Sequence, residues 1–457
     1  MSALAAATRA RASVHLLNVS RNAGPSLSNA GQVRGLMKMP QGARRNAGKG
    51  KDKKKGGEVA VPQKREKRAG AFRPLPAGQL THNIFQNDRV TELHLPVFVP
   101  EQLTQANASK AMALPMPEND AARIFGIPKN LIVDFRVLSK PATVIRDVTL
   151  KVVDRLQAAS QQSSANNRVV LAGASGSGKS YLLLQAVEYA AASKWIVMYI
   201  PRAINLVNST TPYVYDLRTQ TYLQPAFAFQ TLQRFLKVNE AALRSLKTTT
   251  DVEVERRAPV PAGTSLADLV QIGVKDQTVA PTVLSAVLEQ LGKQTDYPVL
   301  LAVDDFQALF CKSSYRAPSF SSIKAWHLSM PRTILDYASG QKTFARGAVL
   351  GAISSTNTTF RLSPELRHAL GIQSWLRPSP YQKIAPEIVE FTKGIETLRV
   401  PDQLSVNEAA SLFEVWMKDK ALHTTGHDDE LFMSKYTESA GNARDFVWKG
   451  LLSTLES

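Results

Sequence analysis

The strongest chemical signal in the sequence is a run of small residues that ends in a lysine and a hydroxyl: Gly173, Ala174, Ser175, Gly176, Ser177, Gly178, Lys179 and Ser180. This spacing is that of the P-loop, in which glycines let backbone N–H groups converge on phosphate oxygens without Cβ clashes. Lys179 is expected to contact the β- and γ-phosphates, and the Ser180 hydroxyl to bind Mg²⁺. We count Tyr181, the next residue, among those that contact the nucleotide.

A second acidic element follows a buried-strand pattern at residues 299–303. The run ends at Asp304, which we expect to hold the Mg²⁺, usually through water. The alternative is an aspartate that only caps a turn at the end of a strand. Asp305 is the candidate catalytic residue, because hydrolytic P-loop enzymes often place a glutamate there. Its shorter side chain predicts slow hydrolysis or none.

The elements around these residues predict the fold class. A β-rich run at residues 168–172 precedes the loop and a helical pattern follows it, which is the context that the motif requires. Further strands are expected at residues 195–200 and 348–353. The last ends in polar residues, of which Ser355 and Asn357 are candidates to touch the γ-phosphate or the attacking water; the alternative is that they merely end the strand. We predict an α/β P-loop NTPase with an inserted-strand, AAA-like parallel sheet.

The C-terminal region is expected to form a mostly helical lid. Ser405 and Glu408 make a capping box that opens a helix. Further on, Gly441-Asn442-Ala443-Arg444 is similar to the second sensor of AAA-like ATPases, where the arginine meets the phosphates. The alternative for Arg444 is a surface arginine near a helix end. The guanine-reading Asn-Lys-x-Asp motif is absent, so motifs do not select the base.

Composition divides the chain into a basic N-terminal part and a nearly neutral body. The chain has 457 residues and a net charge of +18; residues 1–73 hold 17 Lys and Arg against three acids, and the remainder 39 against 35. Residues 1–50 lack acids, which is typical of a mitochondrial transit peptide. The lysine-rich residues 51–78 are expected to be a disordered tail that meets a polyanion, or else a solvated linker. No apolar run is long enough for a membrane span, and the single cysteine, Cys311, excludes an intramolecular disulfide.

The body is expected to comprise three parts. Residues 79–140 are an irregular segment leading into the main domain, residues 141–375 the P-loop domain, and residues 376–457 the lid. A helix is predicted directly after Pro141, with Val144, Ile145 and Val148 on its apolar face.

Four segments in this order resemble the death-associated protein family, the P-loop protein of the mitochondrial ribosomal small subunit: the P-loop, residues 222–239, residues 264–273 and residues 301–309. The resemblance runs from about residue 95 to the C-terminus. It implies a structural subunit of the small-subunit head, in the mitochondrial matrix, that contacts rRNA, neighbouring ribosomal proteins and the large subunit. It also implies a bound GTP or GDP (ATP in some branches) with Mg²⁺. The competing hypotheses are an active AAA-like or STAND-type ATPase and a nucleic-acid remodelling ATPase.

Overall fold

The computed structural model describes residues 93–255, 257–372, 385–422 and 428–456. The predicted transit peptide (1–50), the basic tail (51–78) and the first part of the segment 79–140 lie outside the described residues.

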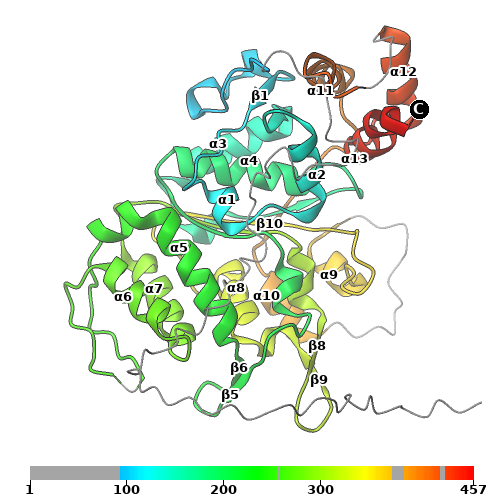
Figure 1. The fold of residues 1–457 in the computed structure, drawn as a ribbon. Helices are drawn as coiled ribbons and strands as arrows, with labels where there is room; N and C mark the ends of the chain where they lie inside the picture. Colours follow the sequence, from blue (N-terminus) through cyan, green and yellow to red (C-terminus); the bar gives the residue numbers. More distant parts are fainter. Residues whose placement is uncertain (1–92, 256, 373–384, 423–427, 457) are drawn as a thin grey trace, which may run out of the picture. The chain divides into compact units, whose positions relative to one another are not determined.

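The centre of the described body is a five-stranded parallel sheet (Figure 1). In spatial order its strands are β11 (Glu396–Arg399), β3 (Arg168–Ala172), β10 (Gly347–Ala352), β7 (Val299–Val303) and β4 (Ile196–Ile200). Every residue of β4, β7 and β10 is buried, which is why these strands read as near-continuous apolar runs. The predicted α/β class and parallel sheet are confirmed. Strand β10 lies between β3, which precedes the glycine loop, and β7, which precedes Asp304 and Asp305.

Helices cover both faces of the sheet. Figure 1 shows α3 and α4 on one side of it and α6, α7 and α8 on the other. The helices between residues 147 and 392 are α3 (Asp147–Ala159), α4 (Lys179–Ala192), α5 (Pro225–Ser245), α6 (Leu266–Lys275), α7 (Ala280–Lys293), α8 (Ser329–Ser339), α9 (Pro364–Ala369) and α10 (Pro386–Thr392). The main hydrophobic core lies between these layers.

Segments that carried the family resemblance have structural roles in this packing. Asn239 interrupts α5, and its side-chain amide bonds both the N–H and the C=O of Val197 on β4, at 2.8 and 2.9 Å. Gly273 lets α6 approach α5, because a Cβ there would lie 2.5 Å from Leu232 Cδ1.

The predicted helix after Pro141 is wrong at its start. Residues 142–144 form β2 (Ala142–Val144), which pairs antiparallel with β1 (Ala111–Ala113), and Ile145 continues the pairing through Ser109 and Lys110. The helix α3 begins only at Asp147. The apolar residues before it fit a helical period, but tertiary pairing with β1 overrides that pattern.

The segment before Pro141 is largely structured where it is described. Besides β1 it contains α1 (Ala121–Phe125) and α2 (Lys129–Val137). Ala121, Ala122 and Phe125 of α1 are buried in the main core, whereas Val137 at the end of α2 belongs to a second apolar cluster. This segment therefore joins the two cores of the body.

The second cluster is the core of the C-terminal lid, a term used here for the described residues from 401 onward. Its helices are α11 (Val406–Lys418), α12 (Asp429–Glu438) and α13 (Ala443–Asp445), followed by a π-helical turn at Phe446–Leu451. Trp416, Phe413, Phe432 and Phe446 form the core with residues from the end of α2. The range 376–457 assigned to the lid from sequence also includes β11, which pairs with β3 and so belongs to the main sheet.

Two hairpins complete the described elements: β5 (Val214–Asp216) with β6 (Thr221–Leu223), and β8 (Lys312–Arg316) with β9 (Ser322–Lys324). Within the described ranges, no helix combines the length and apolar character needed to cross a bilayer.

Candidate functional site

The glycine loop, residues 173–178, connects the end of β3 to the start of α4. Gly176 and Gly178 have φ angles of 82° and 92°, a region that residues with a Cβ rarely adopt. A Cβ at Gly176 would also lie 2.2 Å from the Oδ1 of Asn442 in the lid. Both conformation and close packing therefore require glycine there.

Lys179 lies folded into the glycine loop. Its ammonium donates to the carbonyl oxygens of Gly173, at 3.0 Å, and Ala174, and it lies 3.3 Å from Ser177 Oγ. Burial lowers the pKa of Lys179 to about 8, against the opposing attraction of Asp304. Carbonyl oxygens of the loop therefore largely replace water around the Lys179 ammonium.

The loop already binds one anionic group of the chain. The backbone N–H of Ala174 donates to Oδ1 of Asp402 at 2.8 Å. This hydrogen bond is the main reason that the pKa of Asp402 lies below its usual range. An amide of the loop is therefore oriented to receive negative charge.

Ser180, in the first turn of α4, and Asp304, which follows the carboxyl end of β7, line the same cavity. The Ser180 hydroxyl hydrogen-bonds to the buried Asp304 carboxyl, whose pKa is raised to about 7 by burial and by the neighbouring Asp305. A hydroxyl and a carboxylate are hard oxygen donors of the kind that Mg²⁺ takes, with water completing the shell. No cluster of three or more His, Cys, Asp or Glu side chains suited to a metal occurs in the described part of the chain.

Asp305 points toward the same region in a left-handed backbone conformation, with φ of 57°. Its carboxylate lies 3.9 Å from the guanidinium of Arg202 and hydrogen-bonds to Ser354 and Gln307. Burial raises the pKa of Asp305 in spite of these contacts. Ser355 and Asn357, which follow β10, line the same cavity as Asp305, but Asn357 Oδ1 accepts from the N–H groups of Thr359 and Phe360 at 2.8 and 3.0 Å.

The lid contacts the glycine loop directly. Asn442 donates to the carbonyl of Ser175 at 2.8 Å, the backbone N–H of Arg444 to that of Gly176 at 3.0 Å, and the Arg444 guanidinium to Ser175 Oγ at 3.1 Å. Arg444 therefore lies at the glycine loop, where its resemblance to a sensor arginine places it.

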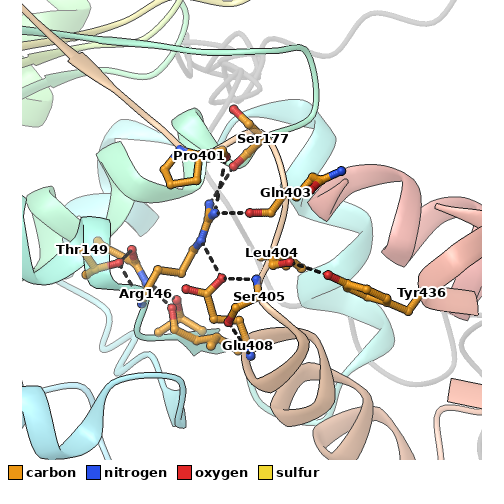
Figure 2. A network of polar contacts seen from close by, with 12 residues as sticks. Arg146, Thr149, Ser177, Pro401, Gln403, Leu404, Ser405, Glu408 and Tyr436 are labelled. Atoms are coloured by element: carbon orange, nitrogen blue, oxygen red, sulfur yellow. Dashed lines mark hydrogen bonds and ion pairs between the residues drawn. The ribbon is translucent and has the colours of Figure 1, made fainter. Parts of the chain in front are cut away.

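Arg146, which precedes α3, connects three segments (Figure 2). Its guanidinium donates to the Ser177 carbonyl at 2.8 Å and to the Gln403 carbonyl at 3.0 Å, and it forms an ion pair with Glu408 at 3.2 Å. The side chains of the pair are only 11% and 9% exposed. Glu408 also accepts from the N–H of Ser405 at 3.0 Å, so the predicted capping box is confirmed and carries the ion pair.

Many of these groups line one cavity of about 430 Å³, a size typical of small-molecule and cofactor sites. Predicted site residues that line it are Ser175, Gly176, Gly178, Lys179, Ser180, Tyr181, Asp304, Asp305, Ser355, Asn357 and Arg444. Gly173, Ala174 and Ser177 lie in the loop but not in the lining. The sequence reasoning missed Asp134, Arg146, Asp402 and Asn442 as site residues; only Asn442 had a signal, since it stands in the turn that contains Arg444.

The fold and site define a class: an α/β protein with an inserted-strand parallel sheet, a glycine loop facing an acidic strand end, and a helical lid on that loop. Comparison with known proteins gives the family. Residues 143–448 match the family model described as mitochondrial ribosomal death-associated protein 3, and the chain belongs to this family.

Individual relatives agree with this assignment. The chain is 27% identical over 400 residues to small ribosomal subunit protein mS29 of Neurospora crassa, covering 84% of both chains. It is 25% identical over 374 residues to the protein of that name from Schizosaccharomyces pombe, covering 80% of this chain and 76% of the relative. The cattle protein of that name is 23% identical over 240 residues, 52% of this chain and 60% of the relative. Membership of this family places the protein in the mitochondrion.

Proposed function

We propose that the protein is a structural component of the mitochondrial small ribosomal subunit whose glycine-loop domain holds a purine nucleotide and Mg²⁺. Family membership and relatives named as small-subunit proteins support the ribosomal part. One observation supports the nucleotide part most strongly: the glycine loop, the Ser180–Asp304 pair and Arg444 line one cavity.

Each group around this cavity has a role in holding the ligand. Loop amides and Lys179 bind the β- and any γ-phosphate, Arg444 binds them from the lid, and Ser180 and Asp304 hold the Mg²⁺ that neutralises phosphate charge. The bound ligand joins the lid to the sheet. A ligand bound by the folded state alone stabilises it by roughly 4 kcal/mol at a thousandfold excess over Kd.

The proposed role is retention of the nucleotide, with little or no hydrolysis. Asp305 is shorter than glutamate by one C–C bond, about 1.5 Å, and its carboxylate is engaged by Arg202, Ser354 and Gln307. A misplacement of about 1 Å can cost a hundredfold in rate. Hydrolysis should be equally slow in wild type and in Asp305→Ala. Several turnovers per minute in wild type that are lost in the variant would favour the ATPase alternative.

The residues outside the described body have proposed roles as well. Residues 1–50 direct import, and the basic residues 51–78 bind rRNA through phosphate contacts. A reporter fused to residues 1–50 that stays in the cytosol would refute the first role. The remaining partners, neighbouring ribosomal proteins and the large subunit, stay proposals from the family resemblance.

The experiment that tests the nucleotide part compares the full-length wild-type protein with Lys179→Ala. Wild type should release about one purine nucleotide per chain on denaturation, and the variant almost none. The melting temperature of the variant should no longer rise when nucleotide and Mg²⁺ are added. A variant that retains nucleotide as wild type does would contradict the assignment.

A further inference from the structure

One wall of the cavity is formed by a face of α2 and by the residue that follows this helix. Leu131, Asp134, Phe135 and Leu138 line it, at positions i, i+3, i+4 and i+7 of a helix. The Phe135 ring meets the Tyr181 ring edge-on, with centroids 5.8 Å apart. Lid residues including Trp416 and Val447 line the same cavity. The α2 wall is apolar and aromatic except for the Asp134 carboxylate. Other polar side chains that line the cavity, such as Gln185 and Glu408, are hydrogen-bonded within the protein.

One oxygen of the Asp134 carboxylate lacks a hydrogen-bond partner. Oδ1 of Asp134 is buried and accepts no hydrogen bond in the described structure, and the carboxyl otherwise meets only its own backbone amide. Among the described residues that line this cavity, no other has a buried side-chain atom without a hydrogen-bond partner. A buried carboxylate oxygen without a donor is costly, and proteins rarely retain one without a reason. The missing donor is therefore expected from a molecule that enters the cavity.

The chemistry of purine edges decides which molecule fits, given the proposed nucleotide function on which this inference rests. With phosphates on the glycine loop, the base occupies the apolar end of the same cavity. Guanine presents two adjacent donors, N1–H and the N2 amino group, to an acceptor with two oxygens. Adenine presents one donor, the N6 amino group, beside the N1 acceptor, which would face the carboxylate with no proton between them.

We propose that Asp134 is the residue that reads the base and selects guanine over adenine nucleotides. Asp134 precedes residue 143, where the family match begins, so this contact belongs to a part of the chain that the match does not cover. Sites built to bond a polar group of the substrate reject analogues that lack it by as much as about 10⁴–10⁵. A selection of at least about a hundredfold for GDP over ADP is expected here.

The test replaces the Asp134 carboxylate with an amide of nearly the same shape, so that one acceptor oxygen becomes a donor NH₂ group. Full-length wild type and Asp134→Asn are titrated with GDP, ADP and xanthosine diphosphate in Mg²⁺ at a pH of about 8. Burial raises the pKa of Asp134 to about 7, so its carboxyl is then mostly ionised. Wild type should prefer GDP. In the variant the GDP preference should fall at least about tenfold and xanthosine diphosphate binding should rise, because an amide donates to the O2 carbonyl and accepts from N1–H. A role in packing alone would not produce this gain.

Controls separate this inference from the proposed function. Asp154→Asn, an exposed carboxylate on α3 outside the cavity lining, should leave all three affinities unchanged. If wild type binds no nucleotide, the proposed function itself fails. If wild type binds ADP as tightly as GDP, or if Asp134→Asn keeps the GDP preference, the base-reading role of Asp134 is wrong while nucleotide binding stands.

Discussion

Replacing Arg146 with methionine should release the lid while leaving the sheet folded. Methionine fills much of the space of the arginine stem but cannot donate to Ser177, Gln403 or Glu408. The Glu408 carboxylate, 9% exposed, would keep only the Ser405 N–H as a partner. Removing one member of a buried ion pair typically costs about 3–5 kcal/mol, because the other charge stays buried and uncompensated.

The cost should be concentrated where the lid meets the loop, so a local measurement is required. Hydrogen exchange monitored by mass spectrometry reports the opening free energy of each segment separately. Amides of α11 should exchange about a hundredfold to a few thousandfold faster in Arg146→Met, since every 1.4 kcal/mol is a factor of ten. Amides of α7, which lies in the main core, serve as the internal control and should be unchanged.

A double-mutant cycle isolates the ion pair from the other lost contacts. Glu408→Gln keeps a capping-box side chain at the same position while removing the charge. The double variant should be more stable than the sum of the single effects predicts, by a coupling energy of about 1–3 kcal/mol. Additive effects, or equal acceleration in α7 and α11, would refute the reasoning that Arg146 fastens the lid to the loop.

Two further predictions concern pH. Burial lowers the pKa of Lys179 to about 8, so the nucleotide affinity measured by calorimetry should fall as pH rises above 8. The affinity of Lys179→Arg should not fall over this range. An equal fall in the variant would contradict the role of the ammonium. Burial, and after it the neighbouring charge of Asp120, raises the pKa of Glu188. The folded protein then binds more protons than the unfolded chain, so the stability from this pair is present below about pH 4.5 and is lost as pH rises. Glu188→Gln should therefore reduce the difference in melting temperature between pH 5 and pH 8. An unchanged difference would contradict the raised pKa of Glu188.

Sequence reasoning predicted the structural elements correctly where they depend on local residues. The glycine loop, Lys179 and Ser180 are contiguous, and Asp304 follows a short apolar run that forms the fully buried strand β7. The capping box of Ser405 and Glu408 depends on residues three apart, so it too was readable. Such features depend on a few neighbouring residues and little on contacts with distant parts of the chain.

The features that were missed depend on contacts across long stretches of chain. Arg146 is a helix-start residue in sequence, and its partner Glu408 is 262 positions away. The four-residue strand β11 lies at the sheet edge, and three of its residues are exposed, so it lacks the apolar run that marked the central strands. Asp134 is one carboxylate on a short helix, and only the cavity around it distinguishes it from a surface residue.

We propose above all that this protein is a component of the mitochondrial small ribosomal subunit that retains a bound nucleotide. The most direct measurement isolates that subunit through a tag on this chain and quantifies the nucleotide released on denaturation. We predict co-sedimentation with small-subunit rRNA and about one purine nucleotide per chain, and loss of that nucleotide when the tagged chain carries Lys179→Ala. A chain that sediments apart from the subunit, or one within it that releases no nucleotide, would contradict the account.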